Sequence, residues 1–96
     1  MAVLAQLKEK SDEIRNIASR YGINNIRVFG SIARQEEKPE SDVDLLVDCQ
    51  EDCSLFDVIA LKDYLEKILG RKIDIVTEES IHWYIRDKIL SEAKKI

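Results

Sequence analysis

The sequence predicts a single α+β domain in which three or more strands are covered by about four helices. Its 96 residues are enough for one hydrophobic core and are expected to form one domain over residues 1–96. Hydrophobic residues make up 45% of the chain and charged residues 35%, a balance typical of globular proteins and not of disordered ones. Stretches with apolar residues at helical spacing alternate with short apolar runs typical of strands.

Residues that begin or end helices mark the boundaries of these elements. Gly22 and Gly70 are typical C-terminal stops, and Ser54 is a typical N-cap. Asn24-Asn25 predicts a turn, and Pro39 excludes helix around its position. The expected order is a helix over 4–21, a strand over 26–29, a helical turn over 31–35, a polar connection over 36–40, a strand over 43–47, a helix over 54–69, a strand over 71–77 and a last helix from about 78.

All three longer helices are expected to bury an apolar face, the first with Leu4, Leu7, Ile14, Ile17, Ala18 and Tyr21 at helical spacing. The residues at core spacing are Leu55, Val58, Ile59, Leu65, Ile68 and Leu69 in the helix 54–69, and Ile81, Tyr84, Ile85 and Ile89 in the last helix.

The chemistry of the chain is concentrated between Phe29 and Asp48. Successive side chains of a strand alternate between its faces, so Asp42 and Asp44 point the same way. Two neighbouring carboxylates repel each other unless a cation lies between them, and hard oxygen ligands suit Mg²⁺. Gly30-Ser31 ends the preceding strand, where a residue without a side chain followed by a helix start accommodates phosphate. This stretch predicts a nucleoside triphosphate site.

Gly30-Ser31, ten intervening residues and Asp42-x-Asp44 in an apolar strand resemble the signature of the DNA polymerase β-type nucleotidyltransferase superfamily. The sequence from Ser41 to Asp48 resembles its minimal nucleotidyltransferase (MNT) branch. The resemblance implies a small polymerase β-like core with a mixed sheet. MNT proteins are commonly encoded beside a HEPN-domain protein as a toxin–antitoxin pair.

Asp74 is a third candidate carboxylate. A lone Asp between Ile73 and Ile75 is a poor strand former and costly to bury, so its position needs a reason. The resemblance supplies one, because the third metal-site carboxylate of the superfamily lies on a neighbouring strand after the intervening helix. The alternative is an Asp at the sheet edge that pairs with Arg71 or Lys72.

The implied reaction is nucleotidyl transfer from ATP, with Asp42, Asp44 and Asp74 as catalytic residues and as ligands of two Mg²⁺ ions. Ser31 and the Gly30 backbone would hold the outgoing pyrophosphate, and Arg34 would add a charge-assisted contact. Many relatives have Gly after this arginine, whereas this chain has Gln35. The bulkier Gln35 would tilt the turn, which bears on the role of Arg34 and not on that of Ser31.

The resemblance further implies an antitoxin that transfers AMP to a hydroxyl, in particular a tyrosine, of a HEPN toxin. The alternatives are an antitoxin that neutralises the toxin by binding alone, and transfer to a small molecule or an RNA end. Larger transferases add a second domain that grips base and acceptor, so the acceptor protein or a second copy of this chain is expected to complete the site.

Composition excludes several other classes of protein. The net charge of −4 and the pI near 5.0 argue against a broad nucleic-acid-binding surface. No apolar run approaches the roughly 20 residues that span a bilayer. The N-terminus has no secretory signal pattern, so a cytoplasmic location is expected. The phosphate-binding motif of P-loop kinases and GTPases is absent from the sequence.

Five further residues have simpler explanations. Cys49 and Cys53 match neither a redox nor a zinc spacing and are expected to be free thiols. His82 is expected at the surface. Trp83 lies off the apolar face of the last helix, so it marks a contact surface or packs over a neighbouring helix. Asp48 is expected to be a charge at a strand end, with a direct role left open.

Overall fold

The computed structural model describes residues 3–36, 38, 41–51 and 53–96. Pro39 and most of the expected polar connection around it lie outside the described residues. The helices are α1 (Val3–Glu9), α2 (Ser11–Arg20), α3 (Gly30–Ala33), α4 (Leu55–Leu69) and α5 (Trp83–Glu92), with a 3₁₀ helix η1 (Glu78–Ser80) before α5. The strands are β1 (Ile23–Phe29), β2 (Val43–Cys49), β3 (Ile73–Thr77) and β4 (Lys94–Lys95).

The strands form one mixed sheet in the order β3-β2-β1-β4. β1 is antiparallel to both β2 and β4, whereas β2 and β3 are parallel and joined by α4. A parallel pair needs such a crossover, and a helix is its usual form. The predicted α+β class with a mixed sheet is confirmed, and β4 adds a short edge strand at the end of the chain.

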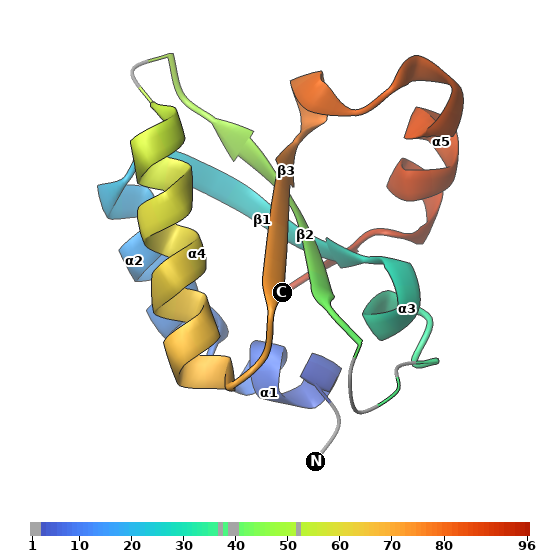
Figure 1. Cartoon of the computed structure of the whole chain (residues 1–96), viewed down its shortest axis with the longest axis horizontal. Coiled ribbons are helices and arrows are strands. Elements are labelled where there is room, and N and C mark those ends of the chain that lie inside the picture. The colour runs from blue at the N-terminus through green and yellow to red at the C-terminus, as the bar shows by residue number, and fades with distance from the viewer. Residues whose placement is uncertain (1–2, 37, 39–40, 52) are drawn as a thin grey trace.

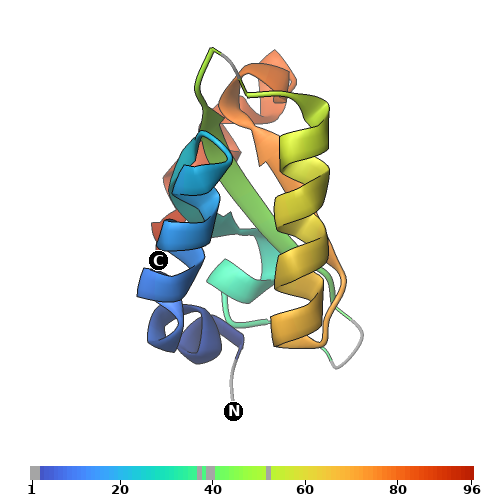
Figure 2. The ribbon, with the colours of Figure 1, turned by 90° about the vertical axis from the view of Figure 1, so that its left-hand side faces the viewer.

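Helices α2 and α4 lie side by side on one face of the sheet, and α5 lies on the far side (Figures 1 and 2). Along β2, Val43, Leu45 and Val47 belong to the core under α2 and α4. Leu46 is equally buried but is not part of that cluster, because alternation turns it to the opposite face. The even-numbered residues of β2, Asp44 among them, therefore face away from the main core.

The expected first helix, 4–21, is two helices instead of one. α1 ends at Glu9 and α2 begins at Ser11. Leu4, Leu7 and Ile14 are buried on both sides of the break, so the apolar periodicity reports burial and not helix continuity. Gly22 follows α2 with φ of 73°, as expected for a glycine stop.

The turn expected at Asn24-Asn25 is wrong, because both residues lie inside β1. The pairing of β1 with β2 shifts register between Asn24 and Arg27, and Asn25 has φ of 51°. Asparagine tolerates the left-handed conformation in a β-bulge as well as in a turn, which explains the misassignment.

α4 begins and ends as the sequence predicts. Ser54 and Asp57 form a reciprocal capping box, and Gly70 ends the helix with φ of 65°. Two residues expected to be buried are not: Leu55 is 73% exposed and Ile59 is 44% exposed. Both lie in the first turns of α4, beyond the part of the helix that buries Leu61, Leu65 and Leu69.

The apolar face expected for the last helix is also wrong. None of the residues of α5 is buried, and Tyr84 is 68% exposed. Trp83 is 81% exposed, so it does not pack over a neighbouring helix. The physical reason is that α5 lies apart from the core cluster under α2 and α4, which contains none of its residues.

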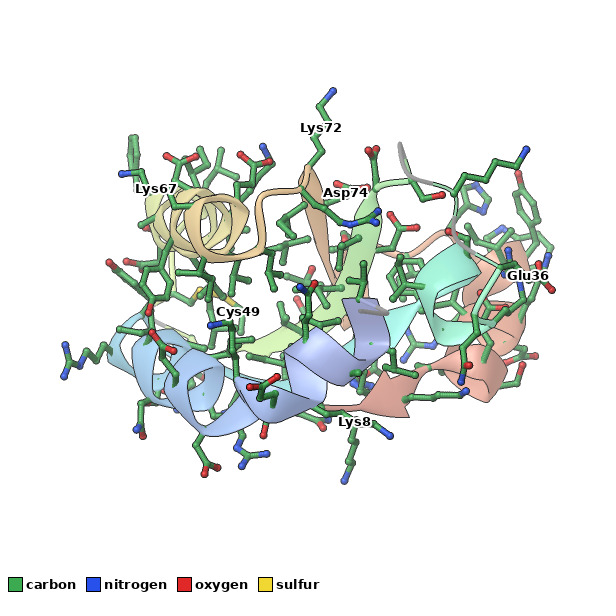
Figure 3. The ribbon with its side chains drawn as sticks, turned by 90° about the horizontal axis from the view of Figure 1, so that it is seen from below. Lys8, Glu36, Cys49, Lys67, Lys72 and Asp74 are labelled. Atoms are coloured by element: carbon green, nitrogen blue, oxygen red, sulfur yellow. A yellow bond between two sulfur atoms is a disulfide. The ribbon has the colours of Figure 1, made fainter. Side chains whose placement is uncertain are left out.

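Cys49 and Cys53 form a disulfide, so the expectation of free thiols is wrong (Figure 3). Their Cα atoms are 5.7 Å apart, within the range that a disulfide spans. The bond connects the end of β2 to the residue before the N-cap of α4. A spacing of four residues matches neither a redox nor a metal motif, yet it is long enough for a local disulfide.

Glu66 connects α4 to the start of β3. Its carboxylate accepts a hydrogen bond of 3.0 Å from the backbone N–H of Ile73 and pairs with Lys62 at 3.4 Å. The hydrogen bond from Ile73, followed by the nearby Lys62, lowers the pKa of Glu66. This contact fixes the strand one residue before Asp74.

None of the helices in the described part of the chain is long and apolar enough to cross a membrane.

Replacing Glu66 by Ala should lower the melting temperature at pH 7 by about 2 to 6 °C, because the Ile73 N–H loses its acceptor. A lowered folded pKa stabilises the protein above the unfolded pKa, and that stabilisation is lost as the pH falls through the folded pKa. Thermal unfolding at several pH values measures the effect. Asp63→Ala, an exposed acid on the same helix, is the control. A difference from wild type that persists unchanged into strong acid contradicts this role.

Candidate functional site

Asp44 and Asp74 lie directly opposite each other on the parallel strands β2 and β3. Residues paired in register point to the same face of a sheet, so the two carboxylates are neighbours. Asp42 precedes Asp44 by two residues and shares its face by alternation. Figure 3 labels Asp74 on β3. The structure therefore brings the three acids to one edge, where β2 and β3 begin and β1 ends.

Asp44 is the electrostatic centre of this group. Partial burial raises the pKa of Asp44, and the charges of Asp74 and Asp42 raise it further. Arg34 acts in the opposite direction, and Glu92 adds to the repulsion. Asp44 is half-buried, whereas Asp42 and Asp74 are exposed. The site thus concentrates negative charge around one partly desolvated carboxylate.

The alternative partners of Asp74 do not pair with it. No ion pair among the described residues joins Asp74 to Arg71 or Lys72. Arg71 instead donates to the carbonyl oxygen of Ser41 at 3.1 Å, which secures the chain just before Asp42. Arg71 therefore supports the loop that carries Asp42, and Asp74 has no protein counter-charge among the described residues.

The Gly30-Ser31 turn lies against Asp44. Phe29, the last residue of β1, pairs with Asp44 across the antiparallel strands, and Gly30 follows with φ of 74°. A Cβ atom on Gly30 would lie 2.6 Å from Asp44 Oδ2. Position 30 thus requires glycine twice, for its backbone conformation and for the space that the Asp44 carboxylate occupies. Ser31 follows in the first turn of α3.

Arg34 is held by two carboxylates. Its NH1 donates to Glu92 Oε2 at 2.9 Å, and its Nε donates to Glu36 Oε2 at 3.2 Å. These hydrogen bonds raise the pKa of Arg34 above its already high value. Gln35 has φ of 57°, a left-handed conformation that a glycine adopts without strain. The departure at Gln35 therefore leaves the turn in a shape that glycine would also adopt.

Glu92 is the residue of this site that sequence reasoning missed. Besides Arg34 it contacts the backbone of Gly30, whose N–H donates to Glu92 Oε1 at 3.1 Å. It comes from the last turn of α5, about 60 residues further along the chain. Nothing in the local sequence distinguishes it from a surface glutamate at a helix end.

The acids fit the chemistry of a divalent cation. They offer hard oxygen ligands of the kind that Mg²⁺ prefers, and a cation would relieve the repulsion that raises the pKa of Asp44. Among the described residues, no three His, Cys, Asp or Glu side chains are arranged as a ready-made metal cluster. Asp42 and Asp74 are exposed, so their carboxylates can turn toward Asp44 without disturbing the core.

Asp48 is a charge at a strand end, as predicted. It accepts hydrogen bonds of 2.9 Å from both Arg27 and Asn25, and Arg27 also pairs with Glu78 at 3.6 Å. A hollow of about 320 Å³ lies beside Asp48 and Cys49, at the end of β2 opposite to Asp44. Two of its three lining acids, Glu78 and Asp48, are paired with Arg86 and Arg27, and the third, Glu79, is exposed.

Comparisons with known proteins give a single family. The model of the nucleotidyltransferase domain family matches residues 11–96. Protein adenylyltransferase MntA of Thermococcus cleftensis is 42% identical over 78 residues, which are 81% of this chain and 79% of MntA. A solved structure of a candidate minimal nucleotidyltransferase has a TM-score of 0.83 at 36% identity, covering 97% of this chain and 93% of that one. The predicted fold is therefore confirmed.

A chain of a toxin–antitoxin structure solved with AMP-PNP has a TM-score of 0.72 at 19% identity. The similarity covers 88% of this chain and 69% of that one. At this level of identity the likeness concerns the fold.

Replacing Gly30 by Ala should destabilise the protein by about 1 to 3 kcal/mol, because the left-handed backbone is strained and the new methyl group meets Asp44. Gly70→Ala is the matched control, since Gly70 has φ of 65° and nothing lies within 4 Å of an added Cβ. Denaturant unfolding of both variants separates the backbone strain, which both share, from the contact with Asp44, which only Gly30→Ala makes. Equal losses would show that Asp44 does not restrict position 30.

Replacing Asp44 by Asn should stabilise the metal-free protein at pH 7 by about 2 to 5 °C in melting temperature. Burial and the neighbouring acids raise the folded pKa of Asp44, so its ionisation destabilises the fold as the pH rises through that pKa. Below the unfolded pKa, Asp44 is protonated in both states and the difference disappears. Calorimetry in chelator measures it, with Asp63→Asn as the control. A lower melting temperature for Asp44→Asn at pH 7 contradicts the repulsion.

Proposed function

This chain belongs to the nucleotidyltransferase domain family, and we propose that it is a Mg²⁺-dependent protein adenylyltransferase. It transfers AMP from ATP to a hydroxyl group of a HEPN-domain toxin, in particular a tyrosine, and so acts as an antitoxin. The observation that carries this proposal is the in-register pairing of Asp44 with Asp74, beside Asp42 and against the Gly30 turn.

Asp42, Asp44 and Asp74 are the residues that would hold two Mg²⁺ ions. Bound there, such ions would neutralise the phosphate charge and lower the pKa of the attacking hydroxyl. The mutual repulsion of these acids destabilises the metal-free fold, as the raised pKa of Asp44 indicates, and without a catalytic role nothing would compensate for it. This cost is the reason to prefer an enzyme over an inert fold.

The acids have two parts in the reaction. Asp42 and the half-buried Asp44 would hold the metal that lets the triphosphate approach, because a bare carboxylate repels phosphate. Asp74 is exposed and lies beside Asp44, so an acceptor can reach it, and it would favour or accept the loss of the acceptor proton. The acceptor oxygen attacks the α-phosphorus, the bond to the bridging oxygen of pyrophosphate breaks, and pyrophosphate leaves with the electron pair.

The Gly30-Ser31 turn and Arg34 receive the leaving pyrophosphate. Gly30 lets a phosphate come close to the backbone, and Ser31 offers its hydroxyl and N–H groups. The guanidinium of Arg34 has five N–H donors, so donors remain besides the two contacts to Glu36 and Glu92.

Two comparisons support the choice of donor and acceptor. The relative from Thermococcus cleftensis is named a protein adenylyltransferase, and a chain of similar fold was solved in a toxin–antitoxin structure with AMP-PNP, an ATP analogue. A HEPN-domain toxin as the acceptor is the inference drawn from the MNT resemblance. In this proposal the acceptor protein supplies part of the site.

Neutralisation by binding alone is the competing function, and one observation favours it. Large apolar side chains are exposed at the starts of α4 and α5, where soluble proteins rarely gather them unless they bind a partner. They are Leu55 at 73%, Phe56 at 82%, Trp83 at 81% and Tyr84 at 68% exposure.

The test is transfer of label from α-labelled ATP to a cognate HEPN-domain protein, in the presence of Mg²⁺. Asp42→Asn combined with Asp44→Asn should lower the rate of labelling by at least about a hundredfold, because the metal ligands are lost. Chelation of Mg²⁺ should have the same effect. Label in the acceptor identifies AMP transfer, since the α-phosphate alone carries it.

Asp63→Asn combined with Asp87→Asn is the matched control, because it also removes two negative charges, but from exposed positions on α4 and α5. This variant should label its partner at the wild-type rate. Toxin neutralisation that survives the Asp42/Asp44 change, with no label transferred by either protein, overturns the enzyme and supports binding alone.

A further inference from the structure

The last helix contributes one side chain to the proposed phosphate-binding turn. Glu92 accepts a hydrogen bond from the Gly30 N–H at 3.1 Å with one carboxylate oxygen and from Arg34 NH1 at 2.9 Å with the other. We propose that Glu92 is a positioning residue of the transferase site, which fixes the Gly30 turn and the Arg34 guanidinium in the arrangement that receives the triphosphate. The inference rests on the proposed function and assigns a role that the motif residues do not contain.

The Gly30 turn needs an acceptor that its own sequence does not provide. The residue at the N-cap of α3 is Phe29, whose side chain offers no oxygen to the first N–H groups of the helix. Gly30 is also the residue whose backbone is least restricted by sterics. The Glu92 carboxylate satisfies the Gly30 N–H with a charge-assisted hydrogen bond and so replaces a local cap by a long-range one.

The Arg34 side chain needs a second restraint. It is 41% exposed, and a long exposed side chain samples many rotamers. The side chain of Glu92 is only 18% exposed, so it is a better-fixed partner than Glu36 at 65%. Holding one Arg34 amino group and the Gly30 N–H with a single carboxylate sets the distance between the turn and the guanidinium.

A fourth carboxylate at this edge is electrostatically unfavourable. Its charge adds to those of Asp74 and Asp42 in raising the pKa of Asp44. The charge of Glu92 therefore destabilises the metal-free site, and only the contacts of Glu92 with Gly30 and Arg34 offset this repulsion. A passive helix-end residue would have no need to lie between Gly30 and Arg34.

The opposite role makes a different prediction. If the carboxylate occupied the turn as a mimic of phosphate, its removal would free the donors and ATP would bind more tightly. If Glu92 positions the turn, its removal loosens both groups and ATP binds more weakly. The sign of the change in KM for ATP separates the two.

The experiment compares Glu92→Ala, Glu92→Gln and Asp87→Ala in the labelling reaction with the HEPN-domain acceptor. Glu92→Ala should raise the KM for ATP about tenfold or more, with kcat changed less, because the turn contacts the triphosphate. Glu92→Gln keeps an acceptor for the Gly30 N–H and should recover part of the loss. Asp87→Ala, an exposed acid on the same helix, should match wild type.

A second readout does not need activity. In the ¹⁵N-labelled protein, the Gly30 amide signal should lie downfield in wild type, where a carboxylate accepts its proton, and move upfield in Glu92→Ala. The Gly70 amide, which donates to the Glu66 carbonyl oxygen, should not move.

Unchanged or lower KM for ATP in Glu92→Ala overturns the positioning role, and so does a Gly30 amide that does not shift. An inactive wild-type protein whose Gly30 signal still shifts on Glu92→Ala supports the contact with the turn and overturns the proposed function instead. The two failures are therefore distinguishable.

Discussion

The parallel register of β2 and β3 is the constraint on which the site depends. It pairs Asp44 with Asp74, and the spacing of about 4.8 Å between neighbouring strands keeps their side chains adjacent. The register is secured from both sides: Val43 donates to the Lys72 carbonyl oxygen, and Glu66 accepts from the Ile73 N–H. A shift of one residue would turn Asp74 into the core and destroy both the site and the packing.

The two faces of the sheet divide stability from chemistry. Val43, Leu45 and Val47 pack under α2 and α4, and this face holds the main core. The other face carries the acids and is covered in part by α5, which buries none of its own residues. The charged groups thus stay accessible while the apolar layer behind them remains intact, which lets a small domain tolerate mutual repulsion at one edge.

Sequence reasoning succeeded where the physical cause is local. Alternation along a strand predicts the shared face of Asp42 and Asp44, and capping chemistry predicts Ser54 and Gly70 at the ends of α4. An acid between two β-branched residues is unusual in a strand, and the superfamily resemblance assigns Asp74 the place of the third carboxylate. The failures are of two kinds. The Asn24-Asn25 pair is a signal for a turn, but it also suits the bulge that the strand forms at Asn25. The contact of Glu92 with Gly30 joins residues far apart in the sequence, so no local pattern predicts it.

Glu92 and β4 belong to the last residues of the chain, and both attach to elements formed near its beginning: Glu92 to the Gly30 turn and β4 to β1. During synthesis the segment that ends in Gly30 emerges long before these partners do. Nascent chains would therefore display the acids of β2 before the turn has its cap. If Glu92 positions this turn, the site should reach its full affinity for nucleotide only once α5 has been synthesised and has docked against α3.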